Sequence, residues 1–219
     1  MELCKELESL VRKYSAASPR AKSFWDAYEK MANLSLDEFM TLSAASPRRI
    51  GRIKTDFSDV DKEFLIKIHP TLATQTVGNL GRVLIAATAS KQEFVEDMII
   101  RGGDDEQAAA IIALNLRKDA EIYKDKVAHA CRTNSTIVHS AASQDNPYAA
   151  KYFDDQEFKQ LVIKTIFMGL EFTQISGLES RFNGELGKSL TDFFDERKAA
   201  GRWLPDSVLE FMEKKGLLK

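Results

Sequence analysis

This sequence has few cysteines and no long apolar run, and each shortage excludes a class of protein. Its two cysteines, Cys4 and Cys131, stand far apart without a Cys-x-x-Cys pair, which argues against a disulfide framework and favours reduced thiols. The longest apolar stretches, such as residues 83–87, fall far short of the roughly 20 residues that a membrane-spanning helix needs. Residues 1–7 lack the apolar core of a secretory signal. We therefore expect a cytoplasmic protein without a transmembrane segment.

Neither sign of charge is in large excess. The chain carries 31 lysines and arginines against 33 aspartates and glutamates, a formal net charge of −2. A dedicated nucleic-acid-binding protein usually has a strong positive excess, so we expect no nucleic-acid partner. One local basic cluster is the exception, and it comprises Arg48, Arg49, Arg52 and Lys54. It can contact phosphates of a nucleic acid, a nucleotide or a membrane surface, but we favour a solvated loop that faces nearby acids such as Asp56 and Asp59.

Motifs of common catalytic and metal sites are missing as well. The three histidines, His69, His129 and His139, form no His-x-x-x-His pair, so each is interpreted as a surface or packing residue. The Gly-x-Ser-x-Gly elbow of one class of serine hydrolases is also missing. Residues 78–81 hold two glycines, but no strand precedes them, so they do not fit a phosphate-binding loop. We predict no metal and no cofactor.

Helical patterns, in contrast, recur along the chain, and strand signals are scarce. The clearest helix covers residues 154–169, and its apolar face is formed by Phe158, Leu161, Val162 and Ile166 and widened by Phe167 and Met168. A second helix covers residues 183–200, ends at Gly201, and directs inward Leu186, Leu190, Phe193 and Phe194. The pattern as a whole predicts an all-α protein, a helical bundle of about ten to twelve helices.

Serine residues mark several expected helix starts. Ser18, followed by proline, is predicted to cap a helix over residues 20–31. Two further serines, Ser35 and Ser90, each precede a glutamate by three residues. This spacing fits the capping box, in which serine and glutamate satisfy free backbone N–H groups reciprocally.

The length of the chain predicts a single domain over residues 1–219, since one core remains efficient at this size. In it we expect the helices of residues 1–130 and those of residues 131–219 to pack together. The hexapeptide Ser-Ala-Ala-Ser-Pro-Arg occurs twice, at residues 15–20 and 43–48, which raises the alternative of a helical-repeat layout. We favour a chance match at common helix boundaries, because the flanking residues do not repeat.

Charged residues are embedded among apolar ones in the C-terminal third. Lys164 stands within an apolar run, Arg181 and Asn183 flank a phenylalanine, and Asp192 and Glu196 share one helix face. A buried charge needs a partner, because leaving it unpaired costs several kcal/mol. These residues can therefore tie helices together, or they can line a polar pocket for an anionic or hydroxylated small molecule. For any single residue we favour the structural tie.

The same third of the chain resembles the EboA family. The resemblance rests on an ordered series: Arg132-Thr-Asn134, Asn146-Pro-Tyr148, Phe153-Asp154, Gln160–Lys164, Phe167, Ile175–Leu178, Arg181-Phe-Asn183, Leu186, Asp192, Glu196–Arg202 and Pro205. Upstream, residues 46–51 and 82–84 are similar to two further landmarks of the family. The chain departs from the family's usual pattern at Lys198, where an aromatic is common, and at Phe194-Asp195, where an Ala-His pair is common. The tryptophan-rich segment usual before Arg82 is also missing.

The resemblance to this family implies a role in metabolite traffic. EboA-like proteins are encoded in a bacterial gene cluster linked to the export of secondary-metabolite precursors, next to proteins that resemble a UbiA-type prenyltransferase and several enzymes. The resemblance implies a helical, cytoplasmic accessory protein. The family has no agreed catalytic residues, so none is carried over to this chain.

Three hypotheses follow. We favour a non-enzymatic accessory protein whose C-terminal helices bind either another protein of the cluster or a small metabolite. The alternatives are an enzyme that uses Glu196 as acid or base with Arg181 or Lys164 stabilising an anion, and a helical scaffold without a small-molecule site. The candidate binding residues are Arg132, Asn134, Lys164, Arg181, Asn183, Glu196, Arg197 and Arg202.

Overall fold

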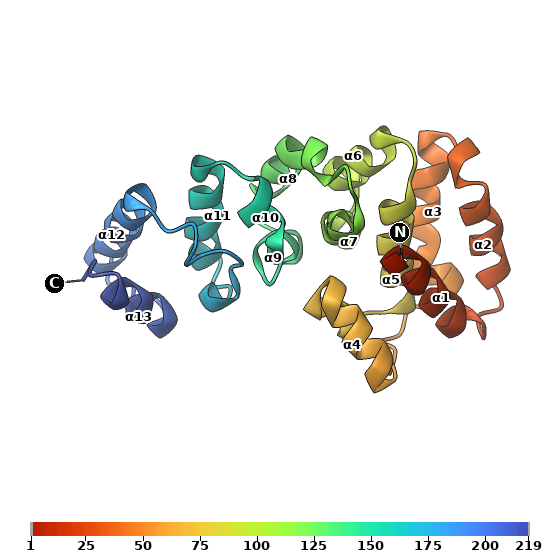
Figure 1. Cartoon of the computed structure of the whole chain (residues 1–219), viewed down its shortest axis with the longest axis horizontal. Coiled ribbons are helices and arrows are strands. Elements are labelled where there is room, and N and C mark those ends of the chain that lie inside the picture. The colour runs from red at the N-terminus through yellow and green to blue at the C-terminus, as the bar shows by residue number, and fades with distance from the viewer. Residues whose placement is uncertain (1, 219) are drawn as a thin grey trace. The chain divides into compact units, whose positions relative to one another are not determined.

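The computed structural model describes residues 2–218 and confirms the all-α prediction (Figure 1). Over these residues it contains thirteen α-helices, twelve of them with seven or more residues, and no β-strand. The chain divides into two compact units, Met1–Ala130 and Cys131–Lys219. That the two pack as a single domain stays a prediction. None of the described helices is long and apolar enough to cross a membrane.

The N-terminal unit is built around one almost wholly buried helix, α5 (Val77–Thr88). The helices α1 (Glu2–Ser15), α3 (Leu36–Ile50) and α7 (Asp104–Ala113) pack against it, and Figure 1 shows α1, α3 and α5 side by side. The other elements of the unit are α2 (Ala21–Glu29), η1 (Met31–Asn33), α4 (Asp59–Ile68), η2 (Pro70–Thr74), α6 (Gln92–Arg101), η3 (Leu114–Leu116), η4 (Ala120–Tyr123) and α8 (Lys124–Ala130). A helix that is apolar on every side belongs in a core, and apart from Asn79, Arg82 and Thr88 the sequence of α5 is apolar.

An unusual proline explains how α3 and α5 fit together. Pro47 lies inside α3 and has no N–H, so the carbonyl of Ser43, four residues earlier, loses its helical donor. Arg82 of α5 replaces that donor: its Nε lies 3.2 Å from the Ser43 carbonyl oxygen. Gly78 allows the close approach, because a Cβ there would lie only 2.4 Å from the Cα of Pro47. The burial of Arg82 is thus explained by the backbone hydrogen bond that α3 lacks at Pro47.

The C-terminal unit consists of α9 (Thr136–Ser143), α10 (Pro147–Tyr152), α11 (Asp155–Phe167), η5 (Phe172–Gln174), α12 (Gly184–Ala199) and α13 (Asp206–Lys214). Within it, α11 packs against α9, η5 and α12. The predicted apolar face of α11 is confirmed, since Phe158, Leu161, Val162 and Ile166 are all buried. Leu186 and Leu190 of α12 are buried as well.

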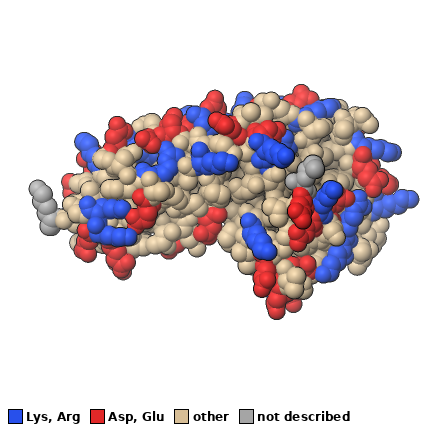
Figure 2. Space-filling model, viewed as in Figure 1, with Lys and Arg blue, Asp and Glu red and all other residues tan. Residues whose placement is uncertain are grey.

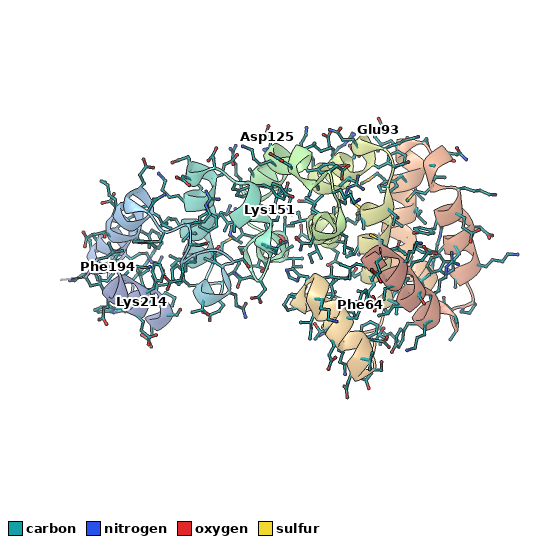
Figure 3. The ribbon with its side chains drawn as sticks, in the orientation of Figure 1. Phe64, Glu93, Asp125, Lys151, Phe194 and Lys214 are labelled. Atoms are coloured by element: carbon teal, nitrogen blue, oxygen red, sulfur yellow. The ribbon has the colours of Figure 1, made fainter. Side chains whose placement is uncertain are left out.

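Three aromatic residues do not lie where the helical pattern placed them. Phe167, expected to widen the apolar face of α11, is 63% exposed. Phe193 and Phe194 of α12 are only half-buried (Phe194 is labelled in Figure 3). The periodicity assigned these residues to an apolar stripe, but the stripe is covered only along part of each helix. The prediction that they belong to the core was therefore wrong.

The predicted helix starts were correct where a side chain forms a capping hydrogen bond with a backbone N–H of the first turn. Ser35 and Glu38 form the predicted capping box of α3, and Asp154 and Glu157 form one at α11. The Ser90 capping box was wrong: α6 begins at Gln92 after Lys91, whose Nζ instead lies 2.7 Å from the Leu34 carbonyl oxygen. The end of the second predicted helix is confirmed, with Gly201 at a φ of 66° after α12.

The two copies of the hexapeptide adopt different structures. The first spans the turn before α2, which begins at Ala21 with no side-chain cap, so the predicted cap by Ser18 was wrong. The second lies inside α3, where Ser-Pro does not mark a helix boundary. The repeated letters therefore do not correspond to a repeated structural unit. A helical-repeat layout stays a prediction.

Candidate binding groove

Two helix faces of the C-terminal unit enclose a groove of about 580 Å³. From α11 it is lined by Lys159, Gln160, Ile163, Lys164 and Phe167, from α12 by Ser189, Asp192, Phe193 and Glu196, and from the segment before α9 by Asn134. On each helix four of these residues follow the spacing i, i+3, i+4, i+7, which places them on one face. The volume lies within the range of small-molecule sites in proteins. We call this space the α11–α12 groove.

The groove combines aromatic and aliphatic side chains with polar and charged ones. Phe167, Phe193 and Ile163 supply the apolar lining, and Phe167 is the most exposed of the three. Such an exposed aromatic side chain gains from any partner that removes it from water, by about 25 cal/mol for each Å² covered. The apolar lining thus suits the flat face of a ligand.

Two opposite charges in the groove have no ion-pair partner among residues 2–218. Lys164 donates from Nζ to the backbone carbonyl oxygen of Arg132, at 2.6 Å, and keeps two further N–H donors. Glu196 is exposed, and its carboxylate makes no hydrogen bond or salt bridge with any described residue. The other two charged residues of the groove already form ion pairs: Lys159 with Glu185 at 3.6 Å, and Asp192 with Lys188 at 2.6 Å. A ligand in the groove therefore meets one available cation and one available anion.

Arg181 and Asn183 lie elsewhere and tie the helices together. Arg181 donates from Nη1 to three carbonyl oxygens at the end of α10, the shortest bond being 2.7 Å to Phe153, and from Nη2 to Asp155 at 2.7 Å. Asn183 caps α12 through the N–H of Leu186 and also donates to Asp155. Neither residue lines the α11–α12 groove. In these two residues the contacts are those of a structural tie.

The three remaining predicted residues are only indirectly related to the groove. Arg132 contributes its backbone carbonyl, which accepts the bond from Lys164, while its side chain is exposed. The guanidinium of Arg197 lies 5.7 Å from the centre of the Phe193 ring, and its Nε is buried without a hydrogen-bond partner. Arg202 is exposed, and its backbone N–H closes α12 by donating to the Arg197 carbonyl at 2.8 Å. Of the eight predicted residues, the groove brings together Asn134, Lys164 and Glu196.

A buried histidine lies on the opposite face of α11 from the groove. His139 of α9 approaches the Thr165 hydroxyl with Nε2 at 3.0 Å and the Cys131 carbonyl oxygen with Nδ1 at 3.1 Å. Burial lowers the pKa of His139, and it raises the pKa of the Cys131 thiol to about 12. Both groups are therefore uncharged at neutral pH. His139 is a packing residue, as predicted, His69 is buried too, and His129 is exposed.

Seven of the ten groove residues, including both aromatics, were not among the candidate binding residues, although Asp192 was noted for its position on the same helix face as Glu196. The signal that could have identified them is the pairing of two stripes, Gln-Ile-Lys-Phe on α11 and Ser-Asp-Phe-Glu on α12. Each stripe mixes apolar and charged side chains on one face, so a search for apolar faces alone passes over it. Across the described part of the chain no group of three or more His, Cys, Asp or Glu side chains is arranged to hold a metal.

Comparison with known proteins identifies the family. The family described as metabolite traffic protein EboA matches residues 22–213, which is most of the 219-residue chain. No curated protein and no solved structure matches this chain. The matched range includes the whole of α11 and α12 and every residue of the groove between them. This chain belongs to the EboA family of metabolite traffic proteins.

Proposed function

We propose that the chain binds a small metabolite in the α11–α12 groove and takes part in metabolite traffic as an accessory protein. The observation that supports the proposal best is the lining itself: an exposed phenylalanine beside a lysine and a glutamate that have no ion-pair partner among residues 2–218. Family membership supports a role in traffic rather than a particular reaction.

The lining defines a class of ligand. A flat, largely apolar molecule would stack on Phe167 and Phe193, with an acidic or carbonyl oxygen accepting from Lys164. At its other side, a hydroxyl or amine would donate to Glu196, and the amides of Asn134 and Gln160 would add neutral hydrogen bonds. Aromatic metabolites that carry both kinds of polar group fit this description.

The enzymatic alternative is weaker, because its three residues do not meet. Arg181 is engaged with backbone carbonyls and Asp155, so Glu196 would have only Lys164 beside it in the groove. An anion stabilised by Lys164 alone could still form, and Glu196→Gln separates the two roles. A binding protein retains most of its ligand affinity and export function in that variant, whereas an acid–base catalyst loses its function.

A test of the proposal uses 1-anilinonaphthalene-8-sulfonate, an aromatic anion that fluoresces when it leaves water. We expect saturable binding to the full chain that weakens by about tenfold in Lys164→Gln and in Phe167→Ser. Trp203→Ser is the matched control, since Trp203 is 74% exposed in the same unit and does not line the groove. Native mass spectrometry of the freshly purified protein shows in parallel whether a metabolite is carried along.

Equal loss of binding in the Phe167 and Trp203 variants would contradict the proposal, because it would mean that the probe only senses exposed aromatic surface. Unchanged binding in both Lys164→Gln and Phe167→Ser would contradict it as well. In that case a partner protein, or a scaffold without a ligand, becomes the better account of the C-terminal helices.

A further inference from the structure

The basic cluster noted in the sequence lies next to a second group of cations in the N-terminal unit. The end of α3 is tied to the start of α2, because Ser18 Oγ donates to the Arg49 carbonyl oxygen at 2.5 Å and Arg49 Nη1 donates to the Ser23 carbonyl oxygen at 3.3 Å. This contact places Arg20 and Lys22 beside the end of α3. We call the combined surface the basic patch, made of Arg20, Lys22, Arg48, Arg52 and Lys54. In Figure 2, lysine and arginine side chains alternate with aspartate and glutamate side chains over α1–α3.

The cations of the basic patch have no acidic partners. All five are exposed, and none forms an ion pair with any of residues 2–218. The acids expected to face the cluster are engaged elsewhere, since Asp56 lies 3.2 Å and Asp59 4.0 Å from Lys62 Nζ. Arg48, Arg52 and Lys54 are thus solvent-exposed, as expected, and the ion pairs of Asp56 and Asp59 are with Lys62.

An apolar side chain projects from the middle of this surface. Ile53 stands between Arg52 and Lys54 and is 84% exposed, the largest exposed fraction among the large hydrophobic residues of the described chain. The backbone that carries it is held in place: Lys54 forms an isolated bridge with Thr76, and Gly78 donates to the Gly51 carbonyl at 3.0 Å. A fixed loop thus presents one isoleucine among several cations.

We propose that the basic patch binds the surface of a membrane rich in anionic phospholipid, with Ile53 inserted at the level of the headgroups. Lipid headgroups supply the negative charge that five unpaired cations attract, and the acyl boundary just below supplies an apolar environment for the isoleucine. A nucleic acid supplies the negative charge but no acyl layer into which the isoleucine could insert. The combination of charge and an apolar tip therefore favours a lipid surface.

This inference goes beyond the proposed function and does not depend on it. The basic patch lies in the N-terminal unit and the α11–α12 groove in the C-terminal unit. Binding would be peripheral and reversible, because no described helix can cross a membrane and a single isoleucine anchors weakly. For a traffic protein, it would hold the chain where apolar metabolites partition.

The experiment measures co-sedimentation of the full chain with vesicles of phosphatidylcholine containing about one quarter phosphatidylserine, at about 50 mM salt. Each basic residue near such a surface strengthens binding by about fivefold, so the triple variant Arg48→Gln/Arg52→Gln/Lys54→Gln should bind about 100-fold more weakly. Ile53→Ser should weaken binding by about fivefold without changing the charge. The control removes three exposed lysines on other elements, Lys5→Gln/Lys67→Gln/Lys118→Gln, and should keep most of the binding.

Several outcomes would overturn the inference. The first is that the wild-type chain does not sediment with the anionic vesicles, or sediments equally with vesicles of phosphatidylcholine alone. The second is that the patch variant and the control variant lose binding to the same extent, which would indicate a general charge effect. The third is tighter binding to a short DNA duplex than to the vesicles, with Ile53→Ser without effect, which would assign the basic patch to nucleic acid.

Discussion

Pro47 and Arg82 are linked through the carbonyl of Ser43, and a double-mutant cycle can measure the resulting coupling of their contributions to stability. Pro47 leaves the carbonyl of Ser43 without its helical donor, and Arg82 Nε supplies one at 3.2 Å. Arg82 also donates to Asn79 at 2.7 Å and lies 3.5 Å from Asp105. Its side chain is only 10% exposed, so water does not easily replace these bonds. Arg82→Met should therefore lower the free energy of unfolding by about 3 kcal/mol.

Arg82→Met should lower the free energy of unfolding by less in a variant whose α3 forms the missing helical hydrogen bond. In Pro47→Ala the backbone N–H of residue 47 can donate to Ser43, so the carbonyl no longer needs Arg82. We expect Arg82→Met to cost about 1.5 kcal/mol less in this background, since one hydrogen bond to a charged group contributes roughly that much. Urea unfolding of the four proteins, followed by circular dichroism, gives the coupling energy. A coupling below about 0.3 kcal/mol would refute the reasoning, because distant, independent sites add to within that margin.

Two further predictions concern the C-terminal unit. Arg181→Ala should lower the free energy of unfolding by about 3 kcal/mol through loss of its bonds to the end of α10 and to Asp155, whereas Arg132→Ala, whose side chain is exposed, should change it by less than about 0.5 kcal/mol. Equal effects in urea unfolding would show that Arg181 is not a structural tie. Burial lowers the pKa of His139 from its ordinary 6.5, so the unfolded chain binds more protons below that pH, and stability should fall as the pH drops from about 7 to about 5. His139→Gln should flatten this slope in thermal unfolding at several pH values, and an unchanged slope would count against the assignment.

The sequence correctly predicted structural features that depend on residues close together in the chain. The capping box at Ser35 and the apolar face of α11 involve residues three and four apart, and each formed as expected. Ser90 has the same spacing, but Lys91 is held by the Leu34 carbonyl, and the helix begins beyond it. A tertiary contact thus overrode a local signal.

The candidate site was only partly predictable for the same reason. Lys164 and Glu196 stood out as charges among apolar residues, and both line the groove. Arg181 gave an equally strong signal, yet its acceptors are backbone carbonyls, which no sequence pattern reveals. Periodicity placed Phe167 on the apolar face of α11, and the residue was therefore assigned to the core. Periodicity shows which side chains share a face, but it does not show whether that face is covered, and Phe167 is exposed.

The most direct test of the account is to map where an aromatic anion binds. Amide NMR spectra of the full chain, recorded during titration with 1-anilinonaphthalene-8-sulfonate, should show saturable shifts concentrated on α11 and α12, around Lys164, Phe167 and Phe193. The chain offers an internal comparison, a second hollow of about 400 Å³ near Phe172 and Phe211 in the same unit. Shifts confined to that hollow, or spread evenly over the surface, would contradict the claim that the α11–α12 groove is the binding site.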